Sequence, residues 1–194
     1  MTFNTEADLG AVERDEWLYA PTIGVGPLRF GMSLDEVVKT AGTFGPTKVS
    51  ECVRHHSIFA PIWRVEVHHR EVAASPPAVT GYVSQAVGLF CIASDAVHGP
   101  QVAFDGLRLV GKDLAELESD TIAYAETHDV GLRYTPEGYA GPDDPGIVLR
   151  AQRVGLALRS RPLFIVTRDG ANTEWDSMPS EEYRLGNNPQ PNVV

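Results

Sequence analysis

The sequence predicts an α+β fold: one or two twisted antiparallel sheets with two packed helices. Three observations lead to this prediction. Strand-like runs rich in β-branched and aromatic residues recur along the chain. Two segments carry apolar residues at helical spacing behind a capping residue. Of the 194 residues, 43% are hydrophobic and 22% are charged, which is ordinary composition for a single globular domain.

The first helix is expected at residues 34–42. Ser33 and Glu36 have the spacing of a capping box, in which each side chain bonds the backbone of the other residue. Gly42 is placed to end the helix. The apolar stripe that would face the core consists of Leu34, Val37, Val38 and Ala41.

The second helix is expected at residues 113–127, behind a similar box formed by Asp113 and Glu116. The segment from Gly31 resembles the segment from Gly111: each follows a strand-like run and opens a helix. Two explanations stay open. The chain contains a pseudo-duplicated β–turn–helix unit, or two capped helices share the same local chemistry.

The remaining structure is expected to be mostly strands. In the segment from Ile62 to His68, apolar and polar residues alternate, which is typical of a half-buried antiparallel strand. Ala60–Pro61 would turn the chain before it, and residues 136–146 form a loop rich in proline and glycine. The strand-like runs are 16–20, 49–59, 62–72, 79–93, 101–110, 129–135, 147–158 and 162–168, and the run 22–31 is a strand or a short hairpin punctuated by glycines.

Most of the net charge of −10 lies near the two ends of the sequence. Residues 1–16 carry −4 and residues 169–194 another −4, which leaves −2 for residues 17–168. We therefore expect a flexible acidic arm, a single α+β domain over 17–168, and a polar, largely disordered tail. Binding of nucleic acid needs a basic stripe, so no nucleic-acid partner is expected.

The targeting and cysteine signals favour a cytoplasmic protein. The acidic first residues contain no apolar segment of a secretory signal, and no apolar run is long enough to span a membrane. Cys52 and Cys91 have no metal-ligand spacing, so we expect two reduced, buried thiols. Sequence alone leaves a disulfide between them open.

One histidine cluster could carry chemistry. If Ala60–Pro61 turns a hairpin, His55 and His68 fall near one another, with Glu66 on the same face as His68. Two imidazoles and a carboxylate suit a metal site or a hydrolase-type centre. The same residues also suit a polar sheet face of cross-strand pairs, and no fixed metal-ligand spacing such as HExxH supports the metal site.

No catalytic motif is present, and no cofactor is expected. The chain contains no Gly-x-Ser-x-Gly elbow, no P-loop and no complete dinucleotide fingerprint. Asp143 and Asp144 lie in the loop rich in proline and glycine, where they either face solvent or contact a partner or cation. Tyr139 and Trp175 lie near polar segments and are candidate interface anchors.

Residues 28–37, reading Leu-Arg-Phe-Gly-Met-Ser-Leu-Asp-Glu-Val, resemble a segment of the BamE/SmpA-like small α+β domains. That segment reads Gly-Met-Ser/Thr-x-x-Glu-Val and ends at a glycine, here Gly42. The resemblance implies a protein-binding role. Members of that family are commonly lipoproteins, whereas no lipidated cysteine precedes the segment here, so we expect no membrane role. More loosely, an acidic α+β chain of this size is similar to the immunity proteins of bacterial toxin systems.

These observations favour a non-catalytic protein-binding protein of the immunity or inhibitor type, whose partner is another protein such as a toxin. The alternative is a metal-binding protein or hydrolase-type enzyme centred on His55, Glu66 and His68. A third hypothesis is a small-ligand binder with a pocket between sheet and helices, which an apolar cavity with a few polar groups would favour.

Overall fold

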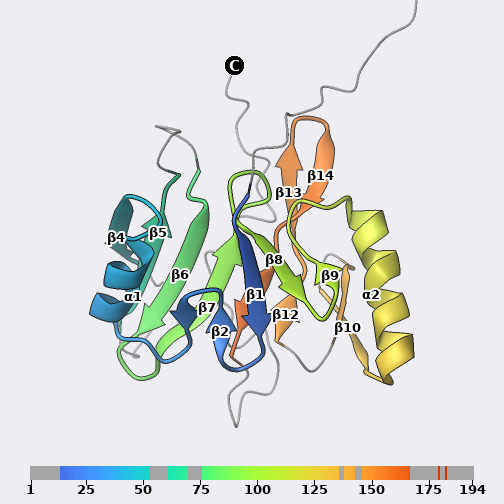
Figure 1. Cartoon of the computed structure of the whole chain (residues 1–194), viewed down its shortest axis with the longest axis horizontal. Helices are drawn as coiled ribbons and strands as arrows, with labels where there is room; N and C mark the ends of the chain where they lie inside the picture. Colours follow the sequence, from blue (N-terminus) through green and yellow to red (C-terminus); the bar gives the residue numbers. More distant parts are fainter. Residues whose placement is uncertain are drawn as a thin grey trace, which may run out of the picture.

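The computed structural model describes residues 14–52, 61–69, 76–135, 138–142 and 146–166, together with Pro179 and Glu182. Two helices and several sheets form an α+β fold, as the sequence predicts. The helices lie at opposite ends of the molecule, with the strands between them (Figure 1).

The chain passes twice through a similar order of elements. The first half consists of β1 (Glu16–Ala20), β2 (Gly24–Val25), β3 (Leu28–Arg29), α1 (Leu34–Ala41), β4 (Thr47–Glu51), β5 (Ile62–Val67), β6 (Val79–Ser84) and β7 (Gly88–Ser94). The second half consists of β8 (Gln101–Phe104), β9 (Leu107–Arg108), α2 (Leu114–His128), β10 (Leu132–Tyr134), β11 (Ala140–Pro142), β12 (Ile147–Val148), β13 (Ala151–Val154), β14 (Ala157–Ser160) and β15 (Leu163–Ile165). Both of the β–turn–helix units that the sequence suggests are therefore present.

Two strand pairs join the halves. In the sheet ordered β3-β2-β1-β8-β9, β1 and β8 are parallel, with Trp17 opposite Val102. This parallel pair corrects the expectation of purely antiparallel sheets. It is allowed because the whole first half of the chain connects the two strands, and parallel pairing needs such a long crossover. In the sheet ordered β12-β15-β7-β6-β5-β4, β7 and β15 are antiparallel, with Ile92 opposite Phe164.

Three of the predicted strands are in fact hairpins. The run 79–93 turns between β6 and β7, the run 101–110 turns at Asp105–Gly106, and the run 147–158 turns at Gly155–Leu156. Asp105 and Gly106 have φ of 45° and 84°. Two successive positive φ values define a type I′ turn, which Asp-Gly favours.

The helices begin where the sequence indicates. Ser33 and Glu36 form the complete capping box at α1. At α2, Asp113 accepts the Ala115 N–H at 3.0 Å, whereas Glu116 lies 3.6 Å from the Lys112 ammonium instead of bonding back to the cap. The helices bury Val37 and Ala41 of α1, and Leu117, Thr121 and Ala125 of α2.

The main core lies between the two large sheets and includes residues of both helices. The ring of Tyr19 connects its parts, because it lies 4.7 Å from the Phe164 ring of β15 and 5.7 Å from the Phe104 ring of β8. A second cluster includes Tyr82, Cys91 and other residues that alternate along their strands with residues of the main core. It occupies the opposite face of the six-stranded sheet. Both faces of that sheet therefore carry buried side chains.

Both acidic ends contribute residues to this fold. The backbone of Asp15 accepts the Gln101 N–H at 2.9 Å, and β1 begins at Glu16, within the predicted arm. Glu182, within the predicted tail, is only 1% exposed. None of the described helices is long and apolar enough to cross a membrane.

Candidate functional site

Glu66 and His68, two residues of the predicted histidine centre, lie in different surroundings. Glu66 lies on β5, 3.3 Å from the Arg64 guanidinium and 3.8 Å from the Lys48 ammonium. His68 follows β5, and its N–H donates to the Pro46 carbonyl at 2.9 Å. His68 lines a cavity that Glu66 does not line.

His55 lies outside the described residues. In the part of the chain that the structure describes, no three His, Cys, Asp or Glu side chains are grouped to hold a metal ion. The carboxylate of Glu66 is instead compensated by two basic side chains, an arrangement typical of a polar sheet surface.

The predicted binding residues are covered only in part. Asp143, Asp144 and Trp175 lie outside the described residues. Tyr139 is partly buried against the main core, and its N–H donates to Thr135 Oγ1 at 3.1 Å. The neighbouring Tyr134, at 55% exposed, is the more accessible aromatic residue of this region.

A buried polar cluster connects Glu182 to the six-stranded sheet. Its carboxylate accepts hydrogen bonds from the Tyr82 hydroxyl and from both terminal nitrogens of Arg161. Burial opposes ionisation of Glu182, but the paired guanidinium outweighs it and lowers the pKa of the carboxyl. Burial, reinforced by the Glu182 carboxylate, raises the pKa of the Cys91 thiol well above its usual range.

The chemistry of this cluster is therefore structural. Cys91 is fully buried, and its raised pKa keeps it in the unreactive thiol form. Cys52 is also a buried cysteine. The bidentate pair between Arg161 and Glu182 satisfies both buried charges and fixes Glu182 against the sheet.

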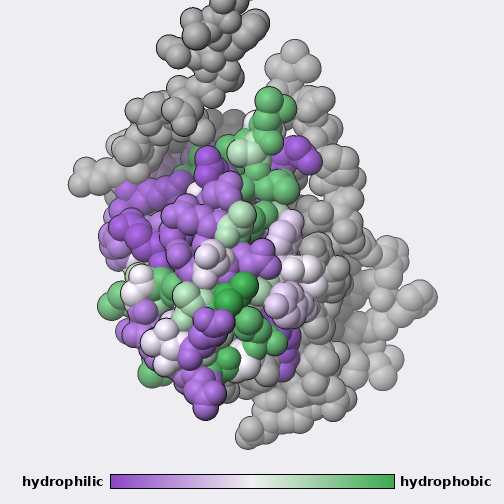
Figure 2. All heavy atoms as spheres, turned by 90° about the vertical axis from the view of Figure 1, so that its right-hand side faces the viewer, coloured by the Kyte–Doolittle hydropathy of each residue, from purple (hydrophilic) through white to green (hydrophobic). Residues whose placement is uncertain are grey.

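The most exposed apolar surface lies on the hairpin β13–β14. These strands pair with one another as a two-stranded sheet, and Arg159 of β14 also forms an isolated bridge with Asp113. The hairpin projects from the molecule beside α2 (Figure 1). At the tip, Leu156 is 97% exposed, and Leu158 on β14 is 39% exposed. Figure 2 shows apolar surface among the uppermost coloured atoms, where this hairpin projects in Figure 1.

The base of this hairpin is firmly attached, while its tip is free. Gln152 donates to the buried Asp95 carboxylate at 2.7 Å and accepts the Ala96 N–H at 3.0 Å. On the other strand, Ser160 exchanges hydrogen bonds with the backbone of Lys112, each at 2.9 Å. The base of the hairpin is thus fixed, while its leucine side chains are exposed to solvent.

The sequence contains a signal for this hairpin that the strand prediction over 147–158 missed. Gly155 has a φ of 60°, while Leu156 after it has a negative φ. This combination, with glycine first, is the type II′ turn that joins tightly paired strands. A Gly-x pair within an apolar run therefore predicts the tip.

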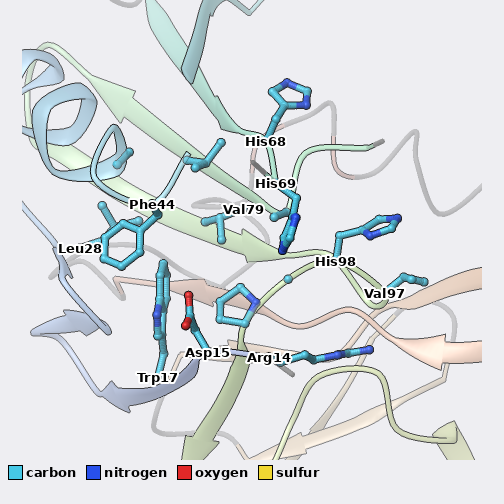
Figure 3. A pocket seen from close by; sticks show the side chains of 15 residues that line it. Arg14, Asp15, Trp17, Leu28, Phe44, His68, His69, Val79, Val97 and His98 are labelled. Atoms are coloured by element: carbon cyan, nitrogen blue, oxygen red, sulfur yellow. The ribbon is translucent and has the colours of Figure 1, made fainter. Parts of the chain in front are cut away.

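A cavity of about 200 Å³ opens between the start of β1, the end of α1 and the loop of residues 95–100 (Figure 3). Its apolar wall includes Trp17, Leu28 and Phe44. The side chains of Asp15, His69 and His98 also line it. Neither the apolar wall nor this set of polar residues was expected from the sequence, because six separated segments contribute to the cavity.

Comparison of the chain with family models, with curated proteins and with solved structures finds no match. The resemblance of residues 28–37 to the BamE/SmpA-like domains therefore stays a prediction. A function is therefore inferred from the hairpin β13–β14, the cavity and the residues around them.

Proposed function

We propose that this chain is a non-catalytic, cytoplasmic protein-binding protein of the bacterial immunity or inhibitor type, which contacts its partner through the hairpin β13–β14. The observation that carries the proposal is the exposed apolar tip of a well-anchored hairpin. Leu156 exposes 97% of its surface to water. Binding that covers this side chain would remove apolar area from water at little cost in ordering, because the base is already fixed.

The charges beside the tip indicate which kind of partner surface would fit the hairpin. Arg153 of β13 is exposed and lies opposite Leu158, so arginine and leucine side chains share one face of the hairpin. Arginine is enriched in protein interfaces, where its guanidinium pairs with carboxylates. The partner surface that fits this face is an apolar depression with an acidic rim.

The proposal is tested by quantitative capture from the cells that produce the protein, with the full chain as bait. Wild type is compared with Leu156→Asp, which places a charge at the centre of the proposed contact. A matched control is Ile23→Asp, because Ile23 is also an exposed apolar turn residue, at 56%, but lies between β1 and β2. We expect one protein that wild type and control retain and that Leu156→Asp loses.

The captured protein is then purified and titrated against the three baits. We expect Leu156→Asp to weaken binding by about a hundredfold, the range of an interface hot spot. The partner's own activity is measured with and without the chain, since an inhibitor must reduce it at equal stoichiometry. Equal affinity of wild type and Leu156→Asp would exclude the hairpin as the contact, and unchanged partner activity would exclude inhibition.

A further inference from the structure

We propose that the cavity beside Trp17 binds a small organic ammonium ion, that is, a ring or short hydrocarbon chain that ends in a protonated amine. This site is separate from the exposed hairpin tip. The inference rests on the aromatic wall, the exposed carboxylate of Asp15, the rigidity of the surrounding loops and the volume of the cavity.

The aromatic wall is formed by Trp17 and Phe44. Their rings meet edge to face, with centroids 5.1 Å apart and an angle of 69° between planes. Trp17 is held from behind by Gly26, since a Cβ added there would lie 2.6 Å from the indole ring. Two fixed rings at a wide angle form the corner of an aromatic cage, and the faces of such rings attract cations.

The charge at the cavity is supplied by Asp15. Figure 3 shows its carboxylate beside the Trp17 ring. The side chain is exposed and forms no hydrogen bond or ion pair with any described residue. The backbone of Asp15 is fixed by the Gln101 N–H, and within the described residues no basic side chain pairs with the carboxylate.

Arg14 also lines the cavity, so a positive charge lies in its wall. Its guanidinium donates to the Ala96 carbonyl at 2.9 Å and interacts with the carboxylate of Asp95. These two partners compensate part of its charge and so reduce its repulsion of a bound cation. The net charge of −10 for the chain also favours the approach of a cation over that of an anion.

The opposite wall is set by the loop of residues 95–100. The buried Asp95 carboxylate accepts the N–H groups of Val97 and His98, at 2.9 and 2.8 Å. His98 is thereby held at the cavity, across from Trp17 (Figure 3). A neutral imidazole there can accept a hydrogen bond from an ammonium group, and a preformed wall limits the entropy lost on binding.

The size of the cavity sets the size of the ligand. An apolar cavity of about 150 Å³ accepts benzene, so about 200 Å³ accepts one ring with a short substituent. The hydrocarbon part would contact Leu28 and Val79, two buried apolar residues that also line the cavity. A bare metal ion fits poorly, because no described group of three ligating side chains is close enough to coordinate one.

The experiment titrates the full chain with three probes of nearly equal shape, followed by NMR at neutral pH. Benzylammonium carries the positive charge, benzyl alcohol is neutral, and benzoate is negative. We expect benzylammonium to bind about tenfold more tightly than benzyl alcohol, because only its ammonium group gains the cation–π contact with the aromatic wall and the ion pair with Asp15. Benzoate is expected to bind most weakly.

Two variants locate the charge. Asp15→Asn should remove the preference for benzylammonium over benzyl alcohol while leaving the neutral probe bound. Glu16→Gln is the matched control: this neighbouring acid is ion-paired with Arg108, lines no part of the cavity, and should leave all three affinities unchanged. Phe44→Leu keeps the cavity apolar and should weaken benzylammonium selectively.

Each contrary result has a distinct meaning. Tighter binding of benzoate than of benzylammonium would show an anion site and overturn the proposal. Unchanged preference in Asp15→Asn would overturn the role of the carboxylate. Absence of binding by all three probes at millimolar concentration would show that the cavity is not a ligand site.

Discussion

The hairpin β6–β7 and the hairpin of residues 147–165 occupy corresponding positions in the two halves, but they differ in burial. Nearly every residue of β6 and β7 is buried. In the second hairpin, β12 and β15 are fully buried, whereas β13 and β14 are mostly half-buried or exposed. One pairing register runs through both parts, with Ile147 opposite Phe164 and Ala151 opposite Ser160.

This difference in burial separates the side chains that pack in the core from the side chains that are available for binding. The inner part of the second hairpin closes the core, so its side chains are selected for packing. The outer part continues the same strands beyond the sheet. Side chains there contribute little to folding, and apolar residues such as Leu156 need another explanation than stability.

The largest effect is expected from Phe164, whose ring is completely buried. Phe164→Ala should lower the free energy of unfolding by about 3–5 kcal/mol, because it removes an aromatic side chain and leaves a cavity. Leu156→Ala should change it by less than about 0.5 kcal/mol, the range of surface substitutions. Urea unfolding of the two variants and wild type measures both values.

A loss above about 1 kcal/mol in Leu156→Ala, twice the usual range for a surface site, would contradict the comparison. It would show that the tip packs against another part of the chain. A small loss in Phe164→Ala would show that β15 is not part of the core. Leu18→Ala is a useful reference, because Leu18 is also an exposed leucine, at 73%, but lies in a central strand.

The second prediction concerns the junction between the two parts of the hairpin. Arg161 lies there, between β14 and β15, and its guanidinium is paired with the buried Glu182. Glu182→Gln keeps the size of the side chain but leaves a buried guanidinium without an anion. We expect a loss of about 3 kcal/mol, at the lower end for a broken buried pair, since the amide retains hydrogen bonds.

This contribution should depend on pH. The pKa of Glu182 is lowered in the folded protein, so the pair stabilises the fold above the unfolded pKa of about 4.3. The stabilisation is lost as the pH falls through the lower, folded pKa. The stability difference between wild type and Glu182→Gln should therefore be constant near neutrality and shrink in acid. A difference that grows in acid would contradict the assigned direction of the pKa shift.

The fold was predicted from the sequence where local chemistry determines the structure. Ser33 and Glu36 define the start of α1 because the capping bonds lie within four consecutive residues. Turns were missed where glycine was read as part of a strand: Asp105–Gly106 and Gly155 are both recognisable hairpin signals. Thr121 of α2 is a polar residue in the core, and it can be buried because its hydroxyl donates to the Leu117 carbonyl.

The candidate sites could not be predicted in the same way, because they depend on contacts between distant segments. Trp17, Phe44 and His98 meet in one cavity although no local pattern connects them. The predicted pairing of His68 depended on a turn at Ala60–Pro61, whereas the observed register places Glu66 opposite Lys48. A shift of the turn changes every cross-strand neighbour, so a site inferred from a hairpin is only as sound as its register.

The smallest of the three effects is expected at Gln152, where the outer part of the hairpin meets the loop of residues 95–100. Gln152→Ala removes a donor from the buried Asp95 carboxylate and the acceptor of the Ala96 N–H. Asp95 keeps two backbone donors, so we expect a loss of about 1–2 kcal/mol. Arg153→Ala, one residue further along an exposed strand, should cost less than about 0.5 kcal/mol.

Urea unfolding measures both losses, and hydrogen exchange of the Ala96 amide should increase only in Gln152→Ala. Equal losses at the two positions would move the boundary between the packed and exposed parts of the hairpin toward its tip. A negligible loss at Gln152 would move that boundary inward to the pair of Arg161 and Glu182.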